Sequence, residues 1–229
     1  LKETLIQKNG NEYLFLTHEE QDVNREIKNI PEDLGKIVKS IGEEIFYGIY
    51  NEKKYRYNAR YHFDFNKTID DRHLNPQKNE IGVKIITPYF DTGQELTAAY
   101  LKMMSSRENS LLIKLPPDTT ALEEMEDIYK IQTYLTRKGG SSVTAEIEAI
   151  KIRKAQEVVK RKERVHSLLI DALQEADFYA HSQKINLQSK NPVERINEGL
   201  RVLIDGIYNK LSYIDSFIES SKELQDILL

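Results

Sequence analysis

The sequence contains no cysteine among its 229 residues. This absence excludes thiol catalysis, disulfide bonds and zinc sites built on cysteine, and it suits a reducing compartment. No apolar run approaches the ~18 residues needed to cross a bilayer, and residues 1–17 lack the apolar core of a signal peptide. We therefore expect a cytoplasmic protein with no membrane partner. Because the chain begins at Leu1 without a methionine, we also expect an internal segment of a longer protein.

Nucleotide-binding loops are missing as well. A G-x-x-x-x-G-K-[ST] loop needs glycines that let backbone N–H groups wrap phosphates, and a lysine that neutralises them. Around Gly35-Lys36, the only Gly-Lys pair, Ile30 stands at the first glycine position and Ile37 at the Ser/Thr position. There is no G-x-G-x-x-G motif, and no nucleophile motif surrounds a histidine. We therefore expect no complete catalytic site and no cofactor.

The charge is weakly acidic overall but uneven along the chain. A formal net charge of −4 predicts no general attraction to nucleic acid. Between residues 151 and 164, however, seven basic residues stand against Glu157 and Glu163. The seven are Lys151, Arg153, Lys154, Lys160, Arg161, Lys162 and Arg164. Helical spacing distributes them around the axis, which favours a solvated helix; contact with a DNA or RNA backbone is the alternative.

Residues 1–30 predict a β-hairpin followed by a helix. Asn9-Gly10 separates two short apolar runs, and both residues tolerate the positive φ that a type I′ turn requires. The segment from Thr17 to Glu20 has the capping-box pattern of a helix start. Val23 and Ile27 then lie on one face of the expected helix.

Residues 31–138 predict a domain built on an antiparallel or mixed sheet. After a helix from Pro31 to about Ile45, we expect residues 46–50 to pair with one long strand at residues 55–66, where aromatic and polar residues alternate. Further strands are expected at 81–87 and 110–115, and further helices at 95–107 and from Asp118 or Thr119 to Thr136.

The best boundary in the chain is Gly139-Gly140-Ser141-Ser142, and residues 141–229 beyond it predict a mainly helical part. One long helix is expected from Val143 to about Tyr179, of a solvent-spanning or coiled-coil kind that could self-associate. Asn191-Pro192 has the residues of another helix start, and 223–229 predicts a short amphipathic helix. The fold class is therefore α+β.

Five residues with metal-binding side chains lie within twelve positions: His62, Asp64, Asp70, Asp71 and His73. On a strand, His62 and Asp64 would project to one side about 7 Å apart, which permits joint binding of a divalent ion. Because no further spacing matches a metal motif, we favour a solvated strand face and loop. A metal-dependent nuclease is a distant alternative.

The aromatic residues at 55–65 are open to two interpretations. Alternating rings can form a stacking platform for single-stranded nucleic acid, but they more often form the buried face of a sheet. We favour the core, because leucine, isoleucine and valine are modest in this region. Arg56 and Arg60 on the polar face are candidate phosphate or carboxylate contacts in either case.

Two stretches resemble the BREX phage-defence P-loop proteins, the BrxC or PglY family. The first is Asn9-Gly10-Asn11-Glu12-Tyr13-Leu14-Phe15-Leu16-Thr17 with the following Glu19–Ile27, and the second is Leu111-Leu112-Ile113-Lys114-Leu115-Pro116 with the helix that carries Tyr129 and Tyr134. They cover about a third of the chain, and no ATP-binding residue of the family matches a position here. The resemblance implies a region after the ATPase, with the hairpin as the wing of a winged helix truncated at Leu1.

These observations predict a non-catalytic structural and interaction module of a larger P-loop NTPase in a phage-defence complex. Its expected partners are other subunits of that complex or the rest of the parent chain. The alternative is a nucleic-acid-binding module that uses the basic residues between 151 and 164 together with Arg56 and Arg60.

Overall fold

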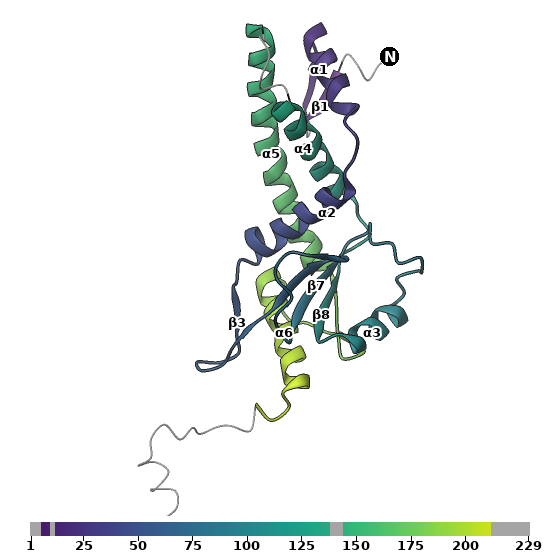
Figure 1. Cartoon of the computed structure of the whole chain (residues 1–229), viewed down its shortest axis with the longest axis vertical. Helices are drawn as coiled ribbons and strands as arrows, with labels where there is room; N and C mark the ends of the chain where they lie inside the picture. The colour runs from purple at the N-terminus through teal and green to yellow at the C-terminus, as the bar shows by residue number, and fades with distance from the viewer. Residues whose placement is uncertain (1–5, 10–11, 138–143, 212–229) are drawn as a thin grey trace, which may run out of the picture.

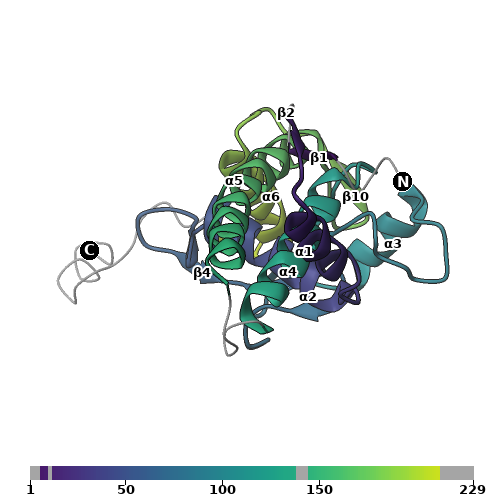
Figure 2. The same cartoon turned by 90° about the horizontal axis from the view of Figure 1, so that it is seen from above.

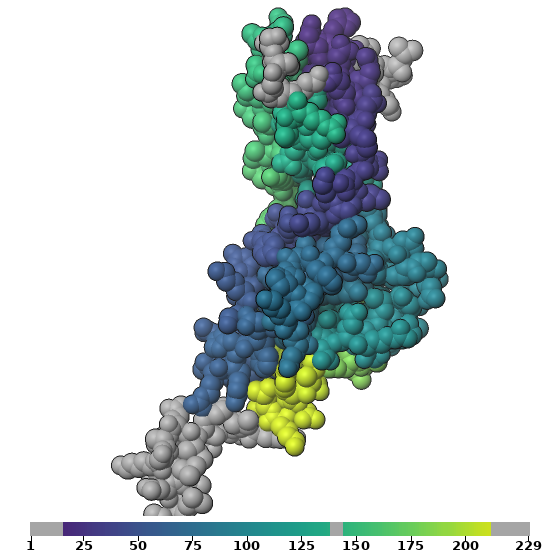
Figure 3. Space-filling view, viewed as in Figure 1, coloured from purple at the N-terminus to yellow at the C-terminus, as the bar shows by residue number. Residues whose placement is uncertain are grey.

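The computed structural model describes residues 6–9, 12–137 and 144–211 (Figure 1). Helices α1 (His18–Lys28) and α4 (Thr120–Arg137) stand beside the N-terminal part of α5 (Ala145–Glu175). We call this group the helical stalk. The view from above shows the same three helices side by side (Figure 2). Below the stalk the molecule widens around a β-sheet, which gives it an elongated shape (Figure 3).

The sheet has six strands, and it is mixed. Its strands lie in the order β10 (Gln183–Ile185), β9 (Asp177–Ala180), β8 (Ser110–Lys114), β7 (Gly82–Ile86), β5 (Asn66–Ile69) and β6 (Arg72–His73). The three central strands β8, β7 and β5 are parallel, and the outer pairings are antiparallel. This arrangement confirms the predicted α+β fold with a mixed sheet.

Helices cover both faces of the sheet. Neighbouring side chains of a strand point to opposite faces, and in β8 both faces carry buried leucines. Leu111 of β8 is buried in the main core with Leu200 of α6 (Pro192–Ile207), whereas Leu112 packs in a separate cluster with Leu101 of α3 (Ala98–Arg107). A Cβ added at Gly199 of α6 would lie 2.8 Å from a methyl carbon of Leu111. The close approach of α6 to the sheet therefore requires glycine at this position.

The predicted helix starts are confirmed at atomic detail. In α1 the Glu20 N–H donates to the Thr17 hydroxyl, and the Glu20 carboxylate accepts from the Thr17 N–H at 2.8 Å. In α6 the side chain of Asn191 accepts from the N–H groups of Val193 and Glu194. Strands β1 (Ile6–Asn9) and β2 (Glu12–Phe15) pair antiparallel as the predicted hairpin. Its turn lies outside the described residues, and the winged-helix assignment stays a prediction.

Two predictions for the aromatic region are wrong. Residues 46–50 do not form a strand, because α2 (Leu34–Glu43) continues into a π-helical segment, η2 (Glu44–Ile49). Residues 55–66 do not form one strand, because β3 (Lys54–Arg56) and β4 (His62–Asp64) fold back on each other as an antiparallel pair. The Asn58 carboxamide oxygen accepts from the N–H groups of Arg60 and Tyr61 at 2.9 and 2.7 Å. This local turn competes with the extended conformation that the alternation predicts.

The preference for aromatic residues as core is confirmed. Tyr55, Tyr57 and Phe65 are buried in the main core, and Tyr61 and Phe63 pack against it. These rings are therefore packed inside the protein and are not displayed as a platform.

The long helix is confirmed as α5, which ends at Glu175 rather than near Tyr179. The chain then enters the sheet as β9 and β10, so residues on either side of the predicted boundary share one sheet and one core. The Gly139–Ser142 break itself, like residues 223–229, lies outside the described residues. In the described part of the chain, no helix is long and apolar enough to cross a membrane.

Arg195 of α6 holds the end of α5. Its guanidinium donates to the carbonyls of Leu173 and Ala176 at 3.1 and 2.8 Å, and to that of Ser189 at 3.2 Å. It also lies 5.0 Å from the ring centroid of Phe178. Carbonyls at a helix end have no partner within the helix. Arg195 satisfies two of them and so joins α5, the sheet and α6.

Replacing Arg195 by alanine should lower the free energy of unfolding by about 3 kcal/mol, because several charge-assisted hydrogen bonds are lost together. Arg195→Lys keeps the charge but not the planar fork, so we expect it to recover less than half of that loss. Urea denaturation followed by circular dichroism measures both variants. Equal stability of the alanine variant and the unchanged protein would show that this contact does not hold the helix end.

Candidate functional site: an ion-pair network and a charged cleft

The predicted basic segment lies entirely within α5, and most of its cations face carboxylates. Lys151 pairs with Glu148 at 3.0 Å, and Arg153 pairs with Glu20 of α1 at 2.6 Å. Lys154, Arg161 and Arg164 belong to a network that joins α5 to α4. Lys160 and Lys162 are exposed.

The ion-pair network consists of Lys154, Glu157, Arg161 and Arg164 of α5 with Glu124 and Asp127 of α4. Glu157 is at its centre, and its two carboxylate oxygens accept from Lys154 Nζ at 2.8 Å and from Arg161 Nε at 3.0 Å. Arg161 Nη1 then reaches Glu124 at 2.7 Å and Asp127 at 2.9 Å across the helix interface. Three cations thus face three carboxylates.

Burial and charge act in opposite directions on this network. Burial would raise the pKa of Glu157, but Lys154 and Arg161 outweigh it and hold that pKa below its ordinary value. Burial likewise opposes the charge of Arg161, whereas Asp127, Glu124 and Glu157 raise its pKa. Lys154, Glu157 and Arg161 are all buried. The lowered pKa of Glu157 and the raised pKa of Arg161 keep both groups ionised at neutral pH, and burial makes Lys154 and Arg161 inaccessible to a nucleic-acid backbone.

Contacts at both ends fix α5 to the rest of the molecule. In the stalk, Arg153 ties it to Glu20 of α1. Nearer the sheet, His166 Nδ1 lies 2.7 Å from a Glu44 oxygen of η2. Together with Arg195 at its C-terminal end, these contacts make α5 the element that connects the stalk to the sheet.

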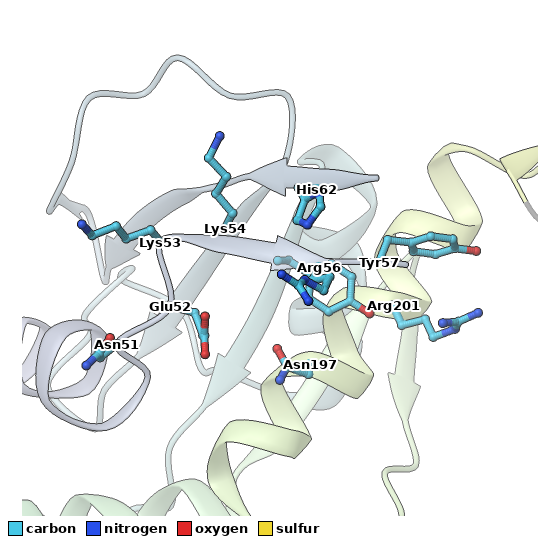
Figure 4. A pocket seen from close by; sticks show the side chains of 10 residues that line it. Asn51, Glu52, Lys53, Lys54, Arg56, Tyr57, His62, Asn197 and Arg201 are labelled. Atoms are coloured by element: carbon cyan, nitrogen blue, oxygen red, sulfur yellow. The ribbon is translucent and has the colours of Figure 1, made fainter. Parts of the chain in front are cut away.

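A cleft of about 790 Å³ opens beside the β3–β4 pair and α6. It is lined by Asn51, Glu52, Lys53, Lys54, Tyr55, Arg56, Tyr57, His62, Asn197 and Arg201. Figure 4 shows Glu52, Arg56 and Asn197 between β3 and α6, with Lys53 pointing away from α6. The predicted contact residue Arg56 is thus in the cleft, whereas Arg60 is an exposed residue of the turn between β3 and β4.

Neighbouring carboxylates offset much of the positive charge of the cleft. Lys54 pairs with Asp64 at 3.4 Å, and Arg201 pairs with Asp205 at 3.7 Å. Arg201 also lies over the ring of Tyr57, 4.7 Å from its centroid. Because cations alternate with carboxylates in this cleft, it is more complementary in charge to a partner surface that carries both signs than to a continuous polyanion.

The metal-binding side chains do not come together. His62 and Asp64 lie exposed on β4, and Asp71 and His73 are exposed around β6. Asp70 is buried with φ of 49°, and its two oxygens accept from the backbone N–H and the hydroxyl of Thr87, both at 2.8 Å. Among the described residues, no group of three histidine, aspartate or glutamate side chains could hold a metal ion.

Lys67 is a buried cation that the sequence reasoning missed. Its Nζ donates to the carbonyls of Phe46 and Glu52 at 3.3 and 3.2 Å, and it lies 4.6 Å from the ring centroid of Tyr47. Burial lowers the pKa of Lys67. The sequence did contain a signal for this burial. Lys67 alternates with Phe65 and Ile69, and alternate residues of a strand lie on the same face of the sheet. Lys67 fixes the loop that lines the cleft to η2.

Replacing Glu157 by glutamine should lower the free energy of unfolding by about 3 kcal/mol at pH 7, because breaking a buried ion pair leaves its partners uncompensated. The control Lys154→Met with Glu157→Met should cost much less, since one charge of each sign is removed and Arg161 keeps its partners on α4. Chemical denaturation measures both. Equal losses in the two variants would contradict the network as described.

The difference in stability between Glu157→Gln and the unchanged protein should depend on pH. Because the folded-state pKa of Glu157 is lowered, its stabilisation is present above the unfolded value of about 4.3 and is lost as the pH falls through the folded pKa. We therefore expect the stability of Glu157→Gln to converge with that of the unchanged protein in acid. A difference that stays constant from pH 7 to pH 3 would refute this.

The pKa of Asp70 is shifted in the opposite direction to that of Glu157. Burial raises its pKa although Thr87 lowers it, so protonation contributes stability that is present below the unfolded pKa and is lost as the pH rises through the folded pKa. Asparagine tolerates the positive φ at this position and carries no charge to bury. Asp70→Asn should therefore raise the free energy of unfolding at pH 7 by about 1 kcal/mol. Denaturation between pH 4 and 8 should show this gain shrinking towards acid. A loss of stability at pH 7 would contradict it.

One family model matches this chain, described as the BREX ATP-binding protein BrxC 4th domain with six-stranded beta sheet. The match covers residues 30–203, about three quarters of the chain, and it includes every strand of the six-stranded sheet described above. Among solved structures, none matches. The chain therefore belongs to the BrxC fourth-domain family and is a region of a BrxC-type BREX protein.

Proposed function

We propose that this region is a non-catalytic structural and interaction module of a larger P-loop NTPase in a BREX phage-defence complex. The observation that carries the proposal is the attachment of α5 at both ends. Ion pairs fix it to α1 and α4 in the stalk, and Arg195 fixes its far end beside the sheet. A helix held in this way moves as one body with its neighbours. It can therefore relay a displacement between partners bound at the stalk and at the sheet.

The pairing of charge supports this role further. Because the buried cations of α5 are neutralised by Glu157, Glu124 and Asp127, they stabilise the stalk rather than attract an external polyanion. The proposal assigns the region no cofactor and no catalytic residue. Its partners are other subunits of the complex or other parts of the parent chain.

Direct contact with nucleic acid has less support. Backbone binding needs several accessible cations along one surface. Of the nine predicted contact residues, Lys154 and Arg161 are buried, and Lys151, Arg153 and Arg164 face carboxylates. The exposed remainder is divided between α5, with Lys160 and Lys162, and the β3–β4 pair, with Arg56 and Arg60. The metal-dependent nuclease alternative gains no support from the exposed His62 and Asp64.

The test uses the full-length parent protein with residues 30–203 replaced by a long Gly/Ser linker. If the region is an interaction module, the variant should keep its basal rate of ATP hydrolysis and should no longer co-purify with the other subunits of the complex. Both quantities are measured on the same preparation, by phosphate release and by affinity capture.

A matched control keeps the region folded. The parent protein with Val202→Glu, a change at an exposed position of α6, should behave as the unchanged protein in both assays. The proposal is wrong if the linker variant still assembles normally with the other subunits. It is equally wrong if ATP hydrolysis is lost while assembly is retained, because the region would then contribute to catalysis.

A further inference from the structure

An apolar stripe runs along the side of α5 that faces away from α4. Ile152 is 60% exposed and Val159 is 57% exposed, and a separation of seven residues places them on one helix face. Exposed alanines surround them, so the stripe consists of Ala145, Ala149, Ile152, Ala155 and Val159. We call it the α5 stripe. In Figure 1, α5 forms one edge of the stalk, with α4 and α1 on its other side.

The stripe lies opposite the packed face of the same helix. Ile150, Lys154 and Arg161 are buried, and Arg161 reaches Glu124 and Asp127 of α4. At 3.6 residues per turn, the centre of this buried face is about half a turn from the line through Ile152 and Val159. The α5 stripe is therefore a second face, available to another molecule while α4 and α5 stay packed.

Charges at the two ends of the stripe have opposite signs. Glu146 and Glu148 lie near its N-terminal end, and Lys160 and Lys162 flank its C-terminal end; all four are exposed. Glu148 also pairs with Lys151 of its own helix, and the exposed Glu163 follows Lys162, so the two lysines at the C-terminal end outnumber one acid. Helical spacing places Glu148 and Lys162 along one border of the stripe, and Glu146 and Lys160 along the other. Each border thus carries an acid at its N-terminal end and a base at its C-terminal end; between them, Arg153 is held by Glu20 of α1 and Lys151 by Glu148.

This pattern is complementary to itself when it is reversed. In an antiparallel pair, Glu148 of one copy meets Lys162 of the other, and Ile152 meets the region of Val159. A parallel pair would instead oppose acid to acid and base to base, which is unfavourable. We propose that the α5 stripe binds a second copy of this chain in antiparallel orientation. This deepens the proposed interaction function, because it names one partner and the surface that binds it.

The small size of the stripe sets the expected strength of association. From Ala145 to Val159 it extends about 21 Å at the helical rise of 1.5 Å per residue. Alanines allow the two helices to approach closely, but so short a contact buries less than the roughly 800 Å² per partner of a standard interface. We therefore expect reversible dimerisation that depends on protein concentration and weakens as salt screens the border charges.

Sedimentation equilibrium of the 229-residue chain tests the surface. The unchanged chain should convert from monomer to dimer as its concentration rises, and Ile152→Glu with Val159→Glu should weaken dimerisation by about tenfold or more. Val202→Glu is the matched control, because Val202 is an exposed apolar residue (42%) on α6, away from the stripe. It should dimerise as the unchanged chain does.

Charge exchange tests the orientation. One variant carries Lys160→Glu with Lys162→Glu, and the other carries Glu146→Lys with Glu148→Lys. Each should fail to dimerise alone, because the two ends of each border then carry the same sign, while an equimolar mixture should form a heterodimer. Circular dichroism confirms that both variants fold.

A monomeric unchanged chain at every concentration, or a mixture that does not associate, overturns the second-copy proposal. That failure is distinct from failure of the proposed function. If the chain is monomeric but replacement of residues 30–203 still abolishes assembly with other subunits, the region is an interaction module whose partner is not a second copy.

Discussion

The ion-pair network between α4 and α5 is the interaction on which the rest of the structure depends. A helix as rich in charge as α5 can bury one face only if each buried cation meets a carboxylate, because an unpaired buried charge is very costly. Glu157 provides this within α5, and Glu124 and Asp127 provide it from α4. The packed stalk, and with it the fixed direction of α5 towards the sheet, follows from this pairing.

The same use of cations recurs at other junctions. Arg195 satisfies the carbonyls at the end of α5, and Lys67 satisfies carbonyls of η2 and the loop beside the cleft. In both cases a long side chain donates hydrogen bonds to backbone carbonyls of another element. The basic residues of this BrxC-type region therefore act to a large extent as internal connectors. In the basic segment of α5, five of the seven cations accordingly face carboxylates of the protein itself.

Much of the fold could be predicted, because its signals are local. The capping box at Thr17, the helix start at Asn191 and the strand that becomes β8 all depend on adjacent residues. The errors arose where a side chain decided the outcome: Asn58 turns the chain that alternation predicts to be straight. The cleft could not be predicted, since Arg56 and Arg201 line it together only because α6 lies beside the β3–β4 pair. For the same reason, the carboxylates that neutralise Arg161 could not be assigned from the basic segment alone.

The central claim is that five of the seven basic residues between 151 and 164 are committed to contacts within the protein, which leaves too few accessible cations for binding to a nucleic-acid backbone. The most direct test is the fluorescence anisotropy of labelled duplex and single-stranded DNA, titrated with the 229-residue chain at low salt and at physiological ionic strength. The account predicts a flat titration at about 0.15 M salt, where exposed single charges are screened. Binding at that ionic strength that weakens steeply as salt rises, and that is lost on charge reversal of Lys160 and Lys162, would contradict it.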